Sequence, residues 1–124
     1  MKIILPGSIR SKKNSKIATI VGGVHKPLRA MILPSKAYTA WEKEARHAAR
    51  QQYRNAPVDD AVHVVAKIYY KGQQPDLSGC LESVGDAMEG VLWMNDKLIM
   101  SWDGSRLEKD NANPRTEIEV MSYE

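Results

Sequence analysis

Residues 75–99 read PDLSGCLESVGDAMEGVLWMNDKLI and combine a helical pattern with the start of a strand. From Ser78 to Leu92, apolar residues recur at the spacing of one helical face, and carboxylates take the opposite face. The apolar set is Leu81, Val84, Met88, Val91 and Leu92, and the acidic set is Glu82, Asp86 and Glu89. Asn95-Asp96 then opens an apolar run. We predict a helix over residues 78–92 and a strand over residues 98–102.

The flanking segments supply the other elements of the expected fold. A β-branched and aromatic run predicts a strand at residues 61–71, and a helical pattern predicts a helix over residues 36–54 with Ser35 as its N-cap. Further strands are expected at residues 2–5, 17–21, 30–33 and 116–123, the second and third as a hairpin. This order predicts an α+β domain in which two helices pack on one face of a mixed or antiparallel sheet.

Length and composition exclude several classes of protein. The 124 residues are 43% apolar and 27% charged, which predicts one globular domain over residues 1–124. No stretch approaches the roughly 20 apolar residues of a membrane span, so we expect a cytoplasmic protein without a membrane partner. The single cysteine, Cys80, excludes an internal disulfide and a thiolate zinc site.

Charge is distributed very unevenly along the chain. Residues 1–54 contain 12 Lys and Arg and 2 acids, whereas residues 55–124 contain 6 Lys and Arg and 13 acids. Such a division is typical of a basic surface for a polyanion beside an acidic surface for divalent cations. Two solvated faces that neutralise one another would also explain it.

Four carboxylates stand at element ends or on one helix face. Asp76 precedes the helix, Glu82 and Asp86 lie one turn apart on it, and Asp96 opens the next strand. Hard divalent cations need several oxygen ligands from separate elements, so these residues form a candidate metal site. The alternative is a capping carboxylate, a solvated helix face and a turn aspartate.

The segment from Asp86 to Ile99, with Pro75-Asp76-Leu77 before it, resembles the central motif of the RusA family of Holliday junction resolvases. The similarity extends over nearly the whole chain. It includes Pro6-Gly7 after the first strand, the Lys12-Lys13-Asn14 loop, the Pro34-Ser35 start of the first helix, and Pro114-Arg115 before the last strand.

This resemblance implies a homodimeric endodeoxyribonuclease that uses Mg²⁺, with Mn²⁺ as a substitute, to make paired cuts in branched DNA at a four-way junction. It places catalytic carboxylates at Asp76 and Asp96, and Asp86 matches a recurrent aspartate of the family. Three positions depart from the family pattern: Ser78 stands for an aspartate, Gly79 for an asparagine and Glu82 for the catalytic lysine.

One hypothesis restores the count of metal ligands. Ser78 and Glu82 are one helical turn apart, so Glu82 could reach the metal while the Ser78 hydroxyl caps the helix or holds a water. The ligands would then be Asp76, Glu82 and Asp96, with Asp86 as a fourth or supporting carboxylate. The missing cation would come from Lys97, Lys71 or the Lys12-Lys13 loop.

Cations of the basic half are candidates for phosphate contacts. The expected DNA-binding residues are Arg10, Lys12, Lys13, Lys16, Arg46, Arg50 and Lys97. A catalytically weak or inactive branched-DNA-binding protein is the main alternative function, and a single-strand or flap nuclease is another.

The remaining reactive and aromatic residues receive weaker expectations. Cys80 lies in a first helical turn, where its pKa could be lowered, but no histidine is near it in sequence. We expect Trp93 and Trp102 in the core or at a dimer interface, with base stacking as the alternative.

Overall fold

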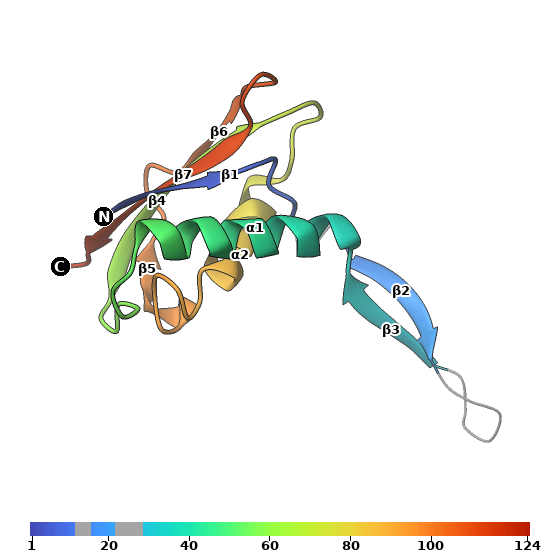
Figure 1. Ribbon diagram of the computed structural model, residues 1–124, viewed down its shortest axis with the longest axis horizontal. Helices are drawn as coiled ribbons and strands as arrows, with labels where there is room; N and C mark the ends of the chain where they lie inside the picture. The colour runs from blue at the N-terminus through green and yellow to red at the C-terminus, as the bar shows by residue number, and fades with distance from the viewer. Residues whose placement is uncertain (12–15, 22–28) are drawn as a thin grey trace.

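The computed structural model describes residues 1–11, 16–21 and 29–124, with the backbone alone for 16–21 and 29–34. It confirms an α+β fold in which two helices accompany a five-stranded mixed sheet (Figure 1). The elements are β1 (Lys2–Pro6), β2 (Lys16–Val21), β3 (Arg29–Pro34), α1 (Lys36–Gln52), β4 (Val62–Tyr70), α2 (Leu77–Ala87), the 3₁₀ turn η1 (Asp96–Leu98), β5 (Ile99–Ser101), β6 (Arg106–Lys109) and β7 (Arg115–Ser122). None of the described helices is long and apolar enough to cross a membrane.

The sheet is built around β4 and β7. Its order is β1-β7-β4-β5, and β6 also pairs with β4. The β1–β7 and β4–β7 pairs are antiparallel, whereas β5 and β6 both run parallel to β4, against successive parts of its length. Strand β6 was not predicted, because three of its four residues are exposed and it carries no apolar alternation. Its position depends on pairing with β4.

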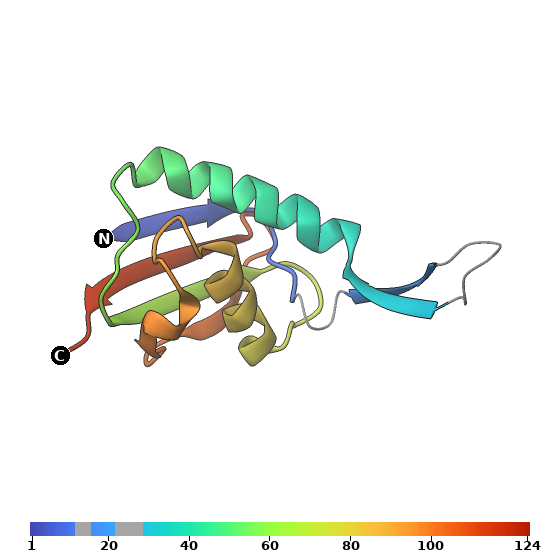
Figure 2. The same ribbon diagram turned by 90° about the horizontal axis from the view of Figure 1, so that it is seen from below.

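Burial alternates along the strands and defines one covered face. Every second residue of β4 from Val62 to Ile68 is buried, as are Ile118 and Val120 of β7. Both helices lie on this face (Figure 2), and α1 packs Tyr38, Trp41, Ala45 and Ala49 against it. The predicted two-helix layer is therefore confirmed.

Strands β2 and β3 form a separate antiparallel pair that projects beyond the N-terminal end of α1 (Figure 1). Their register pairs Lys16 with Pro34 and Val21 with Arg29. The predicted hairpin strands are confirmed at the level of the backbone.

The two helices differ in how well their ends were predicted. Ser35 caps α1 as expected, because its side chain accepts a hydrogen bond from the Tyr38 N–H, and α1 ends two residues before the expected position. Helix α2 ends at Ala87, although the apolar pattern predicts helix to Leu92. Gly90 has a φ of +80°, and Leu92 pairs instead with Val58 through the Val58 N–H at 2.9 Å. Burial of this segment in a turn produces the same apolar sequence as a longer helix.

Candidate active site

The site lies where the loops after β1 and β4 meet the start of α2. Gly7, with a φ of +86°, turns the chain from β1 into a segment in which Ile9 and Ser11 are buried. The Ser83 hydroxyl of α2 donates a 2.8 Å hydrogen bond to the Arg10 carbonyl. A side chain at Gly79 would overlap the Ser11 hydroxyl. The glycine thus allows the segment after β1 to lie directly on α2.

Asp76 is the N-cap of α2. Its Oδ2 accepts hydrogen bonds from the Gly79 N–H at 3.0 Å and from the Ser78 hydroxyl at 3.1 Å. The suggestion that Ser78 caps the helix is therefore wrong: the capping oxygen belongs to Asp76, and Ser78 donates to it. Because the helix N-terminus carries partial positive charge, it favours the ionised carboxylate at this position.

Three of the four predicted carboxylates line a single pocket. We call it the acidic pocket; it has a volume of about 360 Å³ and is lined by Ser78, Leu81, Glu82, Gly85, Asp86, Asp96, Ile99 and Trp102. Ser78, Glu82 and Asp86 follow one another at intervals of one turn along α2, and Asp96 faces them from η1. Asp76, at the N-terminus of α2, lines a different cleft. The structure thus brings Glu82, Asp86 and Asp96 together and leaves Asp76 to one side.

Hydrogen bonds between side chains and the backbone hold the segments that form the acidic pocket. The Glu89 carboxylate, just after α2, accepts a 3.1 Å hydrogen bond from the Asp96 N–H. Arg46 of α1 donates from Nη1 to the carbonyls of Ala87 at 2.7 Å and Glu89 at 3.0 Å. These bonds fix the end of α2 against α1 and against the turn that carries Asp96.

The ligand atoms of the acidic pocket are of the chemical type that binds a hard divalent cation. Carboxylate and hydroxyl oxygens are the ligands that Mg²⁺ and Mn²⁺ prefer. Within the described part of the chain, however, no group of three His, Cys, Asp or Glu side chains is placed to hold an ion. The predicted ligands Asp76, Glu82 and Asp96 therefore match a metal site in chemistry and are not gathered around one point.

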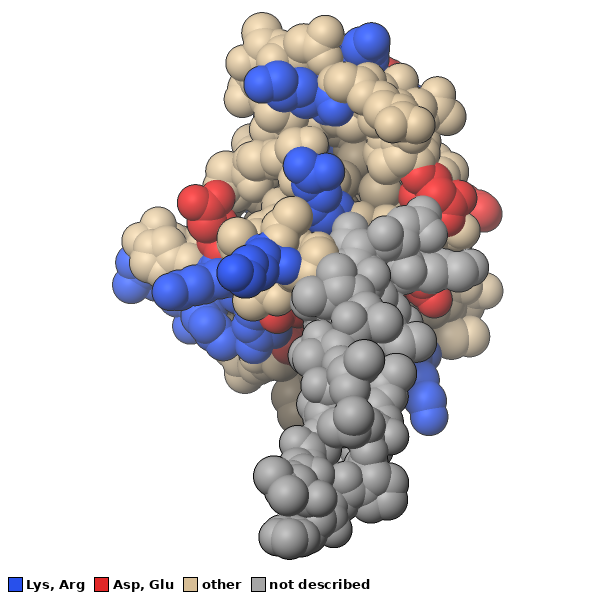
Figure 3. Space-filling model, turned by 90° about the vertical axis from the view of Figure 1, so that its right-hand side faces the viewer, with Lys and Arg blue, Asp and Glu red and all other residues tan. Residues whose placement is uncertain are grey.

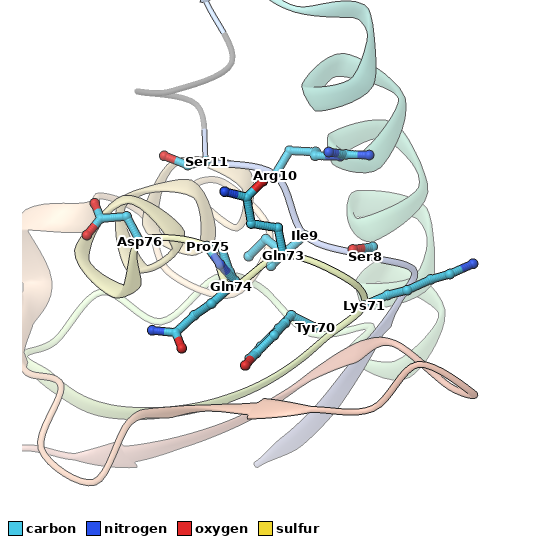
Figure 4. Close-up of a pocket in the computed structure, with 10 residues that line it drawn as sticks. All are labelled: Ser8, Ile9, Arg10, Ser11, Tyr70, Lys71, Gln73, Gln74, Pro75 and Asp76. Carbon is cyan, nitrogen blue, oxygen red and sulfur yellow. The ribbon is translucent and has the colours of Figure 1, made fainter.

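A second cleft lies at the N-terminus of α2 (Figure 4). Its Asp76 accepts a hydrogen bond from Ser78, which lines the acidic pocket. We call it the polar cleft; it has a volume of about 280 Å³ and is lined by Ser8, Ile9, Arg10, Ser11, Tyr70, Lys71, Gln73, Gln74, Pro75 and Asp76. Asp76 points away from the side to which Arg10 and Lys71 extend (Figure 4). The cleft therefore has a cationic end and an anionic end.

The predicted DNA-binding residues have different environments. Arg10 lines the polar cleft, and Lys97 is exposed in η1 beside Asp96. Arg46 donates hydrogen bonds to the end of α2, so this predicted phosphate ligand also has a structural role. Arg50 lines a third pocket together with Arg54. Lys16 belongs to β2, for which only the backbone is described, and Lys12 and Lys13 lie outside the described residues. Seen from the end of the molecule that carries β2 and β3, Lys and Arg side chains gather on the described surface (Figure 3).

Several residues near the site were missed or misjudged from sequence. Tyr70, Gln73 and Gln74 enter the polar cleft because the loop after β4 turns toward α2, and residue type alone carried no signal for them. Burial, with a smaller effect of Asp76, raises the pKa of Cys80 to about 11, so the expectation of a lowered pKa is wrong.

The tryptophans separate into core and site. Trp93 is completely buried and donates from Nε1 to the Gly85 carbonyl at 3.0 Å, as expected of a core residue. Trp102 is half-buried and lines the acidic pocket. A sequence signal for Trp102 existed in its place at the end of the strand predicted over residues 98–102; in the structure Asp96 begins η1 instead, and β5 ends at Ser101.

Comparison with known proteins connects this geometry to a family. The family model for the RusA endodeoxyribonucleases matches residues 6–121 of the 124-residue chain. The matched range contains the polar cleft residues Ser8 to Asp76 and all residues of the acidic pocket. A comparison with curated proteins gives no match. The extent of the family match shows that the chain belongs to the RusA endodeoxyribonuclease family.

Proposed function

We propose that the protein is a divalent-metal-dependent endodeoxyribonuclease that resolves four-way DNA junctions by paired cuts, acting as a homodimer. Membership of the RusA family implies Holliday junction resolvase activity, and enzymes of this family act on branched DNA and generally depend on a divalent metal. The observation that carries the proposal for this chain is the convergence of Glu82, Asp86 and Asp96 on one pocket from two elements.

Glu82 replaces the ligand that Ser78 does not provide. Positions 78 and 82 line the same pocket one turn apart, so a longer carboxylate at 82 reaches the space that an aspartate at 78 would occupy. Glu82 of α2 and Asp96 of η1 would hold Mg²⁺, with Asp86 of the same pocket or Asp76 of the polar cleft as a further ligand. When bound, the metal would supply Lewis acidity toward water and the phosphodiester.

The described cations bind the DNA backbone outside the acidic pocket. Arg10 and Lys71 lie at the cationic end of the polar cleft, and Arg50 and Arg54 line a pocket near the C-terminal end of α1. Phosphate contacts of this kind give affinity with little sequence information. Lys71 or Lys97 would supply the positive charge that the family's lysine gives at position 82.

The test is cleavage of a labelled four-way junction beside matched linear duplex and flap DNA, with Mg²⁺, Mn²⁺ or chelator. We expect paired, metal-dependent cuts in the junction alone. Asp96→Asn and Glu82→Gln should each lower the cleavage rate at least 100-fold, because each removes an anionic ligand. Glu119→Gln is the matched control, since Glu119 is exposed on β7 at the uncovered face of the sheet.

The second candidate function is junction binding without chemistry. It is favoured by the absence, among the described residues, of a ready three-ligand metal group. Tight binding with no cuts in any metal would support it. In that case the double variant Ser78→Asp/Glu82→Lys, which restores the family pattern at both positions, should create cleavage. Equal cutting of flap and junction would instead support a general flap nuclease.

A further inference from the structure

Trp102 gives the acidic pocket an aromatic wall. Trp41 and Trp93 are 5% and 0% exposed, so Trp102 is the tryptophan with open surface in a pocket. A methyl group added at Gly85 would lie 3.9 Å from both Ile99 Cδ1 and Trp102 Cζ2. The indole and Ile99 therefore lie over the bare backbone of Gly85. Together with Leu81 these residues give the pocket an apolar surface beside the Asp96 carboxylate, because Asp96 Cβ would lie 3.7 Å from the same methyl group.

The negative charge of the acidic pocket determines which part of a DNA strand can contact its aromatic surface. Glu82, Asp86 and Asp96 line the pocket, and its described lining includes no Lys or Arg. Without a bound metal these carboxylates repel phosphates, whereas they do not repel an uncharged base. The polar cleft offers Arg10 and Lys71 for phosphates. The two cavities therefore offer different surfaces to a strand: cations for phosphates away from the scissile bond, and an aromatic surface for a base beside the carboxylates.

We propose that the acidic pocket binds an unstacked nucleobase of the substrate and that Trp102 is the surface on which this base stacks. Aromatic side chains stack on every base, because each base presents a π-face. Bases at a branch point lose part of their stacking, which lowers the cost of moving one into a pocket. The inference rests on the proposed function, since it takes DNA as the ligand, and it adds a base-binding site next to the carboxylates.

The experiment uses the full chain and four-way junctions in chelator, so that binding is measured without cleavage. A single 5-iodouracil is placed in turn at each position around the crossover, and photo-crosslinked peptides are identified by mass spectrometry. We expect a crosslink from one position to Trp102. Trp102→Phe should keep that crosslink, whereas Trp102→Leu should lose it and bind the junction at least 5-fold more weakly. Met100→Leu is the control, since Met100 is exposed on the neighbouring strand β5.

The outcomes separate the two proposals. Normal junction binding with crosslinks only elsewhere, or equal affinity of Trp102→Leu and Trp102→Phe, would overturn base stacking and leave junction resolution standing. Thermal unfolding of both variants excludes a folding defect as the cause of weaker binding, and the wild-type crosslink does not depend on any variant. No binding to any branched DNA would overturn the proposed function and the base site together.

Discussion

Asp76 is the N-cap of α2 and also a proposed metal ligand, and substitution can separate the observed role from the proposed one. Asparagine caps a helix about as well as aspartate, so Asp76→Asn should change the free energy of unfolding by less than about 0.5 kcal/mol. Asp76→Ala removes the acceptor of the Gly79 N–H and should cost about 1 kcal/mol. If Asp76 is also a metal ligand, both variants should lose cleavage. Urea unfolding and junction cleavage measure the two effects, and full activity of Asp76→Asn would leave Asp76 with the capping role alone.

Arg46 and Arg50 lie one turn apart on α1 and should behave differently. Arg46 donates to two carbonyls at the end of α2, so Arg46→Gln should lower the free energy of unfolding by roughly 1–2 kcal/mol. Arg50→Gln should leave stability unchanged and reduce the slope of log affinity against log salt by about one. Urea unfolding and junction titration over a range of salt test the pair. A stable Arg46→Gln with a reduced salt slope would show that Arg46 acts in DNA binding and contributes little to stability.

Cys80 should make the protein sensitive to alkali. Its thiol pKa is near 9 in an unfolded chain and is raised to about 11 here, mainly by burial. The unfolded state therefore loses the proton first, and stability decreases as pH rises from 9 toward 11 by roughly 1.4 kcal/mol per pH unit. Below pH 9 this contribution is constant. Denaturant unfolding of wild type and Cys80→Ala from pH 8 to 10.5 should show a steeper decline for wild type, and parallel declines would contradict the assignment.

At the scale of elements, Gly79 sets how closely the segment after β1 approaches α2. Replacing glycine by alanine within a helix normally raises the free energy of unfolding by as much as about 1 kcal/mol. At position 79, however, the added methyl group would overlap Ser11. We expect Gly79→Ala to destabilise the fold by about 1–3 kcal/mol. Gly85→Ala is the matched control on the same helix, since its nearest neighbour would be Asp96 Cβ at 3.7 Å.

A double variant tests the same contact from the other side. Ser11→Gly removes the hydroxyl that the methyl group would meet, so it should restore much of the stability that Gly79→Ala loses. Thermal unfolding of the four proteins in this cycle gives the coupling energy. Additive effects would show that another neighbour limits the size of residue 79.

At the scale of the whole molecule, paired cleavage requires two sites. A four-way junction has approximate two-fold symmetry, and a C₂ dimer presents equivalent sites to equivalent strands. We expect sedimentation to give twice the chain mass of 13.9 kDa and titration to give one dimer per junction. A protein that stays monomeric while it makes both cuts would contradict the dimer.

Local sequence patterns determined much of the architecture. Ser35 and the helical pattern after it identify α1, the β-branched run identifies β4, and the apolar stripe identifies α2. Helix capping and hydrophobic periodicity depend on residues within one or two helical turns of one another, so they can be recognised in the sequence. The carboxylates were found for the same reason, because a strand end, a helix face and a turn each have a local signature.

Tertiary packing alone decided which of these residues meet. Asp96 joins Glu82 and Asp86 because the turn after α2 folds back on that helix, whereas Asp76 lies at the cap beside the polar cleft. Arg46 donates a hydrogen bond to a carbonyl at the end of α2, and residues 106–109 form β6 by pairing with β4. Trp102 lines the acidic pocket. These contacts join residues far apart in the chain, and their geometry depends on how whole elements pack, which no local pattern encodes.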